Sequence, residues 1–260
     1  MNPIRGNCHW RLICVKERMA RSGLIRVLAC WLVLSAALQA QRYDFHVYRQ
    51  AEGLKNLAIN ALTTDGFGFL WVATENGVYR FLGSNFEQYG KEQGIAERDV
   101  EDIYADSTGA VWAGTGENLY RWDGQRFQAV GKNPIQIQGA QRLAAEDARH
   151  LLVVDKGRLY RLEHDAQGRM LSYAPVFSRE TLASKPELSQ LSSLRVDGDR
   201  TVWMGCGTML CSWLPGLESM VTQWGMDKGV PKSVWRSVLM CGVSTGCSDR
   251  EAIEKPECLG

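Results

Sequence analysis

One spacing recurs along the chain and limits the folds that it can adopt. Asp65 and Trp71 are followed 41 residues later by Asp106 and Trp112, so that the Asp precedes the Trp by six residues in both places. A repeat of this length is the sequence signature of arrays in which every copy forms one supersecondary unit. The main body of the chain is therefore expected to be a repeat protein.

Two further copies are more diverged. The third aligns Glu146 with the aspartates and Leu152 with the tryptophans, and the fourth has Asp197 and Trp203 at the same separation of six. The chain is longer between Leu162 and Lys185, and we interpret that stretch as an insertion. Four copies in register predict four equivalent structural units.

Each copy shows the hydrophobic pattern of four short strands. The first copy predicts strands at 59–64, 69–73, 78–81 and 86–89, and the second at 100–104, 110–113, 119–122 and 127–130. Asp and Gly between these segments favour tight turns. Four-stranded units repeated at this interval predict an all-β fold, a β-propeller with four-stranded antiparallel blades.

We expect about four blades in a partial or open ring, preceded by a helical signal peptide. The blades are placed near residues 53–90, 94–131, 134–180 and 187–224, with the start of a fifth at 229–239. Residues 41–48 carry the pattern of an outer strand and are expected to form one.

The recurring Asp and Trp residues are interpreted as structural. A large ring in each second strand can wedge between neighbouring blades, and an Asp at a fixed offset fits a turn better than a paired-carboxylate catalyst. This assigns a structural role to six residues: Asp65, Trp71, Asp106, Trp112, Asp197 and Trp203.

The segment Gly53–Arg80 carries a resemblance to a known family. It contains Gly-Leu and then Asp-x-x-Gly-x-Leu-Trp-Val-x-Thr-x-x-Gly-Val-Tyr-Arg, which resembles the two-component regulator propeller repeat. The resemblance covers roughly residues 41–239. In that family such repeats form the periplasmic sensor of bacterial histidine kinases and diguanylate cyclases. The resemblance implies a non-enzymatic, ligand-sensing propeller from a membrane-anchored, dimeric receptor. No kinase or cyclase motif is present in this sequence.

The amino terminus has the pattern of a secretory signal peptide. Arg21 and Arg26 precede an apolar run at 27–38, and Ala40 offers a cleavage point. Met19 is a more ordinary start for such a signal than Met1, and Cys30 gives a weak alternative of lipidation. We expect residues 1–40 to be removed and the protein to be exported to the periplasm of a Gram-negative type bacterium.

Charge argues against nucleic acid as a partner. After Ala40 the chain holds 24 Lys and Arg against 28 Asp and Glu, without a basic stripe. The expected partner is an unknown small molecule or glycan.

The repeat pattern ends near Met240. The positions of the Asp and Trp in a fifth copy are occupied by Cys241 and Cys247. We interpret residues 240–260 as a non-native tail, produced by a frameshift or an early stop, with a naturally short tail as the alternative. A truncated propeller would leave blade faces open, so self-association through them is expected.

The sequence predicts no catalytic group, metal site or cofactor. The four His do not cluster, and no Cys-x-x-Cys occurs. Cys206 and Cys211 flank one hairpin turn, and whether they form a disulfide is left open.

Ligand contacts are expected on one face of the propeller. The turns between second and third strands and the links between blades share that face. The mouth would be lined by Lys55, Asn56, Thr74, Glu97 and Asp155 together with six favoured contact residues: Glu75, Asn76, Arg98, Glu117, Asn118 and Lys156. The alternatives are a propeller enzyme, either a quinone-dependent dehydrogenase or a polysaccharide-cleaving protein, and a protein-binding scaffold.

Overall fold

The computed structural model describes residues 46–217 and 221–225. The predicted signal peptide, the fifth-copy segment at 229–239 and the tail at 240–260 lie outside these residues. The chain divides into two compact units, residues 1–47 and 48–260, and every strand described here belongs to the second.

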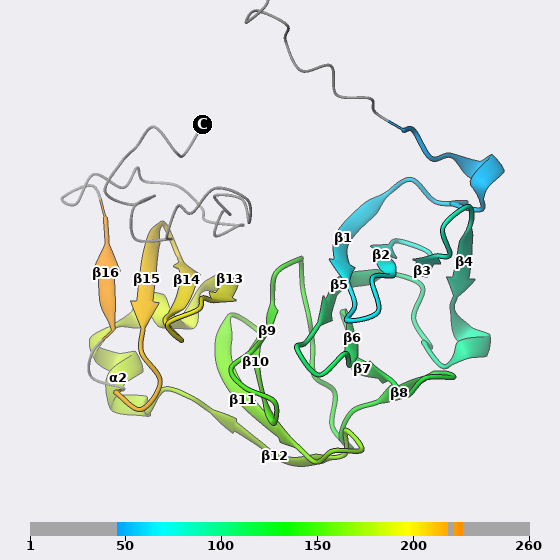
Figure 1. The fold of residues 1–260 in the computed structure, drawn as a ribbon. Coiled ribbons are helices and arrows are strands. Elements are labelled where there is room, and N and C mark those ends of the chain that lie inside the picture. Colours follow the sequence, from blue (N-terminus) through cyan, green and yellow to red (C-terminus); the bar gives the residue numbers. More distant parts are fainter. Residues whose placement is uncertain (1–45, 218–220, 226–260) are drawn as a thin grey trace, which may run out of the picture. The chain divides into compact units, whose positions relative to one another are not determined.

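The first two copies form two separate antiparallel sheets, each a simple meander (Figure 1). The first sheet consists of β1 (Ile59–Thr64), β2 (Leu70–Thr74), β3 (Gly77–Phe81) and β4 (Phe86–Tyr89). The second consists of β5 (Val100–Ala105), β6 (Val111–Thr115), β7 (Leu119–Trp122) and β8 (Phe127–Ala129). All eight strands lie within one or two residues of the predicted segments.

The third and fourth copies form two more sheets of the same kind. The third consists of β9 (Leu143–Ala145), β10 (His150–Asp155), β11 (Arg158–His164) and β12 (Met170–Pro175). The fourth consists of β13 (Leu191–Val196), β14 (Val202–Cys206), β15 (Met209–Trp213) and β16 (Thr222–Trp224). Four four-stranded antiparallel sheets confirm the predicted all-β propeller fold.

The predicted insertion at 162–185 is wrong over most of its length. Its first half completes the third sheet, because β12 pairs with β11. The paired residues run from Tyr160 opposite Pro175 to His164 opposite Met170. The extra residues are instead the short helix α2 (Arg179–Ser184), capped by Ser178, and the 3-10 turn η3 (Pro186–Ser189). Sequence pattern missed β12 because its side chains are mostly exposed and do not alternate.

The predicted outer strand at 41–48 is not seen in its described part. Residues 46–49 have no strand structure and lead into the 3-10 turn η1 (Gln50–Glu52). The ring of Tyr48 packs edge-on against Phe81 and Phe86, with centroid distances of 4.9 and 5.6 Å. The side chain of Tyr48 therefore covers the outer part of the first sheet, but residues 46–49 add no strand to that sheet.

Apolar clusters hold consecutive sheets together. One joins Trp71 and Val78 of the first sheet to Val100 and Ile103 of the second. Equivalent clusters join the second sheet to the third, around Trp112, and the third to the fourth. Trp71 and Trp112 are both fully buried, which fits the predicted wedge role.

Trp203 has different surroundings. Its ring lies 6.0 Å from Trp224, which belongs to the same sheet, and not against another described sheet. The wedge role predicted for Trp203 therefore stays a prediction.

The spacing of six residues between Asp and Trp has a structural cause. The carboxylates of Asp65, Asp106 and Asp197 accept a hydrogen bond from the indole N–H six residues later, at 2.7, 3.0 and 3.0 Å. In each case the other carboxylate oxygen accepts the backbone N–H groups of the second and fourth residues after the Asp. One side chain thus closes the turn and fixes the ring, a contact that the sequence did not predict.

The glycine that begins each of the first two copies is required by close packing. Gly94 has φ +101°, and a Cβ there would lie 2.1 Å from the carbonyl oxygen of Phe127. The neighbouring Ile95 is fully buried. The Gly-Ile pair therefore packs closely against β8, the last strand of its own sheet.

The first strand of the first sheet is more exposed than its counterparts. Ile59 and Leu62 are 46% and 59% exposed, whereas the equivalent Val100 and Ile103 are buried. Apolar side chains at these positions are suited to packing against another blade. Self-association through this face stays a prediction.

Cys206 and Cys211 form a disulfide, which settles the pairing that the sequence left open. They occupy the repeat positions of Thr74 and Tyr79, and both are fully buried. The disulfide links β14 to β15 across their hairpin.

The Asp–Trp hydrogen bond can be tested by Asp106→Ala. We expect the free energy of unfolding to fall by about 2 kcal/mol, because the buried indole N–H and turn N–H groups lose their acceptor. Asp123→Ala is the control, since Asp123 also accepts two backbone N–H groups of its own turn, those of Gln125 and Arg126, but at an exposed site and without an indole, and it should cost less than about 1 kcal/mol. Equal losses in urea denaturation would contradict the structural role of the indole contact.

The disulfide can be tested by reduction. Closing so short a loop stabilises by about 2 kcal/mol in the chain-entropy model. A reductant should lower the free energy of unfolding by that amount, measured by tryptophan fluorescence. The double variant Cys206→Thr, Cys211→Tyr restores the residues of the first two copies and should lose this sensitivity. Unchanged sensitivity would show that another cysteine pair is responsible.

Candidate functional site

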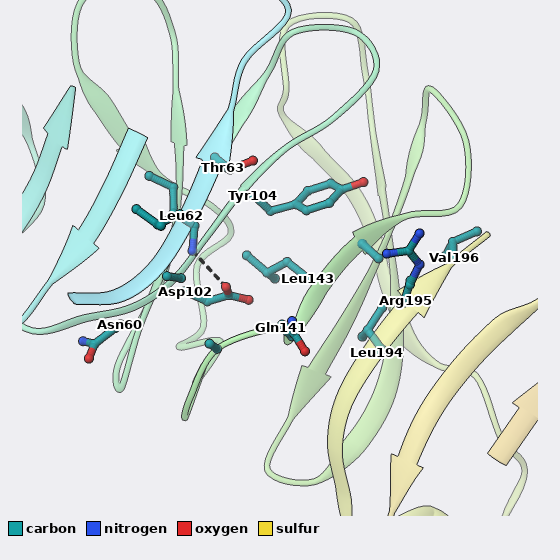
Figure 2. Close-up of a pocket in the computed structure, with 14 residues that line it drawn as sticks. Asn60, Leu62, Thr63, Asp102, Tyr104, Gln141, Leu143, Leu194, Arg195 and Val196 are labelled. Carbon is teal, nitrogen blue, oxygen red and sulfur yellow. Dashed lines mark hydrogen bonds between the residues drawn. The ribbon is translucent and has the colours of Figure 1, made fainter. Parts of the chain in front are cut away.

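A cavity of about 360 Å³ is lined by the first strand or the preceding link of all four sheets (Figure 2). The first strands contact one another in succession, β1 with β5, β5 with β9 and β9 with β13. The cavity is lined by residues 60–63, 102–104, 140–141, 143–144 and 194–196. Because this cavity draws on all four sheets, it is the candidate site.

The first strands of three sheets have a β-bulge or irregularity at the same repeat position. The pairing register shifts between residues 59 and 61 in β1, between 100 and 102 in β5 and between 191 and 193 in β13. Bulges redirect side chains and are common beside functional sites. In the second sheet this redirection puts a carboxyl group in the cavity wall.

Asp102 is the central polar residue of the wall. It is only 3% exposed, and its Oδ2 accepts the backbone N–H of Arg142 at 2.7 Å. Its Oδ1 accepts the N–H of Ile103 at 3.0 Å, the contact drawn in Figure 2. Asp102 therefore joins the second sheet to the chain entering the third, while lining the cavity.

Burial changes the protonation of this carboxyl group. Loss of solvent raises the pKa of Asp102 to about 7, although hydrogen bonds from the backbone of Arg142, Gln141 and Ile103 oppose the rise. This carboxyl group thus changes from neutral to negative near neutral pH.

The other polar groups of the cavity are of different kinds. Figure 2 shows the hydroxyl of Tyr104, the amide of Gln141 and the guanidinium of Arg195 among the lining side chains. Burial raises the pKa of Tyr104, so its phenol keeps its proton and can donate. Gln141 is held in a left-handed conformation, φ 59°, and its carbonyl accepts the N–H of Leu194 at 2.8 Å.

These groups stand beside apolar side chains. Leu62, Leu143 and Leu194 line the same cavity. A mixed wall of this kind can hold a small polar molecule by several hydrogen bonds while covering its apolar faces. No charged cluster dominates the wall.

The six predicted contact residues do not line this cavity. Two of them meet, since Arg98 Nε donates to Asn76 Oδ1 at 3.2 Å and the Arg98 carbonyl accepts the N–H of Gly77. The link before the second sheet is thereby tied to the β2–β3 turn. Four of the six residues lie in the β2–β3 and β6–β7 turns, as expected.

Asn118 belongs to a second small network. Its amide and the hydroxyl of Tyr120 both donate to Glu97, at 2.7 and 2.5 Å. Burial opposes ionisation of Glu97, but these two hydrogen bonds outweigh it and lower its pKa. Burial and the bond to Glu97 raise the pKa of Tyr120 to about 12.

The remaining predicted residues lie in turns. Glu75 follows β2, and its N–H donates to the Ala58 carbonyl at 3.3 Å. The N–H of Glu117 donates to Thr115 Oγ1 at 3.3 Å, and Lys156 adopts φ 50° between β10 and β11. Their role as ligand contacts stays a prediction.

Sequence reasoning missed the cavity residues because it treated first strands as packing elements. One signal was available: Asp102 interrupts an apolar alternation in Val100–Ala105 without being in a turn. The bulge that aims it into the cavity has no such signal.

The described residues hold no group of three or more His, Cys, Asp or Glu placed to bind a metal ion. Among them there is also no helix with the length and apolar character needed to cross a membrane.

Comparison with known proteins supports the fold. Neither a family model nor a curated protein matches the sequence. Two solved structures of the extracellular domain of one B. thetaiotaomicron protein, BT4673, match; one is described as part of a one-component system and the other as part of a hybrid two-component system. Their TM-scores are 0.53 and 0.52, at 16% and 14% identity. The matches cover 71% and 68% of this chain but only 23% and 22% of those domains.

An enzyme has a similar fold. Virginiamycin B lyase from Staphylococcus aureus matches with a TM-score of 0.51 and 12% identity, over 76% of this chain and 63% of the lyase. At these identities the comparisons establish the propeller fold and do not separate a sensor from an enzyme.

The raised pKa of Asp102 predicts a pH dependence of stability. A carboxyl group whose pKa is higher in the folded protein contributes stability below its ordinary pKa of 3.8, and loses it as pH rises through about 7. The free energy of unfolding should therefore fall between about pH 4 and pH 7, by at most about 4 kcal/mol.

Asp102→Asn is the matched variant, because its amide oxygen can still accept from Arg142. Its urea midpoint should change less with pH than that of the wild type. Identical pH profiles for the two proteins would show that Asp102 does not titrate in this range.

Proposed function

We propose that this chain is the ligand-sensing propeller part of an extracytoplasmic signalling receptor and performs no chemistry itself. The observation that carries the proposal is the cavity formed jointly by all four sheets, with hydroxyl, amide, carboxyl and guanidinium groups in one wall. A site built from several blades can transmit occupancy to their packing, which is what a sensor requires.

The fold and the sequence pattern point the same way. The Asp-x-x-Gly-x-Leu-Trp repeat resembles that of two-component regulator propellers. Extracellular domains of bacterial signalling systems are among the structures with this fold. The output of such a receptor, by kinase or cyclase, belongs to the same proposal.

Export is supported by two independent features. The basic residues and apolar run before Ala40 have the pattern of a secretory signal. The disulfide between Cys206 and Cys211 is a bond that persists in oxidising compartments. We therefore place the mature protein in the periplasm.

The ligand class follows from the cavity. Hydroxyl, amide, carboxyl and guanidinium groups beside leucine side chains suit a small polyhydroxylated molecule, such as a sugar or the end of a glycan. The turn residues Glu75, Asn76, Arg98, Glu117, Asn118 and Lys156 are proposed as contacts for a longer ligand.

One observation favours an enzyme as the alternative. A buried carboxyl group with a pKa near neutrality is suited to acid–base chemistry. Both oxygens of Asp102, however, accept backbone N–H groups, and its role in joining two sheets explains its burial. The sensor therefore remains the better proposal.

Ligand binding can be tested by thermal unfolding of the full chain against sugars and small glycans. A cavity ligand at one hundred times its Kd should stabilise the protein by about 2.7 kcal/mol. Gln141→Ala should abolish this stabilisation, and Glu117→Ala, in a turn away from the cavity, should retain it.

If Glu117→Ala abolished the stabilisation and Gln141→Ala retained it, the ligand would be assigned to the turns. Stabilisation that neither variant changes would contradict both sites. Chemical conversion of the ligand during incubation with the protein, measured by chromatography, would contradict a non-enzymatic role.

A further inference from the structure

One position of the first strand lies in the cavity wall in every sheet. It is the residue that pairs with the repeated Trp of the second strand, or with Leu152 in the third sheet. The register gives the pairs Thr63 and Trp71, Tyr104 and Trp112, Ala144 and Leu152, and Arg195 and Trp203. The first member of each pair lines the cavity of about 360 Å³. We call Thr63, Tyr104, Ala144 and Arg195 the four wall residues.

The wall residues differ from one sheet to the next although their surroundings within the sheets are alike. Thr63, Tyr104 and Arg195 all stand opposite a Trp in the same kind of antiparallel pair. Packing within the sheet therefore does not account for a hydroxyl, a phenol and a guanidinium at equivalent places. Because all of them line one cavity, the difference points to the molecule that the cavity holds.

Arg195 gives the wall its positive charge. It is the one basic side chain among the described residues that line the cavity, and Figure 2 draws its guanidinium there. A guanidinium fork matches the two oxygens of a carboxylate and binds them by parallel, charge-assisted hydrogen bonds. Since a guanidinium has several N–H donors, such a contact is compatible with other hydrogen bonds of Arg195.

The acid of the wall has a different task. Asp102 accepts the backbone N–H groups of Arg142 and Ile103, at 2.7 and 3.0 Å. Burial is the main cause of its raised pKa, and the causes that oppose the rise are backbone hydrogen bonds. Asp102 therefore holds the link to the third sheet, and the guanidinium of Arg195 is the charged wall group that suits an anionic ligand.

Two wall residues offer hydroxyl groups. Thr63 Oγ1 accepts the N–H of Ala105 at 3.2 Å, which leaves its own proton to be donated. Burial raises the pKa of Tyr104, so its phenol keeps its proton. Hydroxyl groups that donate and accept suit the hydroxyl groups of a ligand. The fourth wall residue, Ala144, has only a methyl group and takes up little of the cavity.

We propose that the cavity binds a sugar acid, a polyhydroxylated molecule whose carboxylate lies against Arg195 and whose hydroxyl groups lie against Thr63 and Tyr104. This inference rests on the proposed ligand-sensing function and narrows the ligand to one that carries a carboxylate. A small free carboxylate shares the oxyanion chemistry, so the test includes one.

Binding can be measured with the full chain by calorimetry, using glucuronate and glucose as probes. The two sugars differ only in that a carboxylate replaces the hydroxymethyl group. We expect glucuronate to bind about tenfold more tightly than glucose or better, because the guanidinium forms a charge-assisted pair with the carboxylate alone. Acetate, which lacks the hydroxyl groups, should bind more weakly than glucuronate.

Arg195→Gln should lower the affinity for glucuronate about tenfold, to that for glucose, and leave glucose unchanged. Arg126→Gln is the matched control, since it removes the same charge at an exposed site outside the cavity. It should leave both affinities unchanged.

Arg195→Thr guards against a variant that fails to fold. It introduces the residue that the first sheet has at the same register position, opposite a Trp. Thermal unfolding checks that the variant is folded, and it should lose the preference for glucuronate as Arg195→Gln does.

Tyr104→Phe tests the hydroxyl contacts separately from the charge. It removes only the phenol hydroxyl, which is proposed to contact groups that both sugars have. The affinities for glucuronate and for glucose should therefore fall by a similar factor, and their ratio should stay the same.

Four results would overturn the proposal. They are glucose binding as tightly as glucuronate, glucuronate binding that both folded Arg195 variants leave intact, acetate binding as tightly as glucuronate, and binding of neither sugar to the folded wild type. The sensor function fails separately, when no sugar or glycan of the wider panel stabilises the chain.

Discussion

The hydrogen bond from a tryptophan indole to an aspartate six residues earlier organises this propeller. In three of the four sheets one carboxylate closes the first turn and fixes the ring of the second strand. A ring held in this way presents a rigid apolar face, and in the first two sheets the next sheet packs against that face. Turn geometry and blade packing therefore depend on the same side chain.

The third sheet shows what happens when this bond is absent. Leu152 replaces the indole, Glu146 turns to Arg161, and Trp213 of the fourth sheet fills the interface from the other side. The comparison also shows that the acid of a repeat pairs with the arginine of that repeat only where no indole bonds the acid. The two differences in the third repeat, Glu146 and Leu152, thus alter both its packing and its ion pairing.

The candidate site follows from the first strands. The pairing register of three first strands shifts just before Ala61, Asp102 and Ser193, and of these residues only Asp102 carries a carboxyl group in the cavity wall. Its hydrogen bond to Arg142 ties two sheets together at the cavity wall. Asp102 therefore belongs both to the cavity wall and to the contact between the second sheet and the chain that enters the third.

The sequence by itself determined the repeat, the four-stranded units and the turn role of the aspartates, since these depend on local hydrophobic alternation and on side chains that bond their own backbone. It also located the strands of the first two copies nearly to the residue. Only the tertiary structure decided that Met170–Pro175 completes the third sheet, that Cys206 and Cys211 are joined, and that Asp102 lines a cavity. Those outcomes depend on bulges and on contacts between sheets far apart in the chain, which residue spacing does not encode.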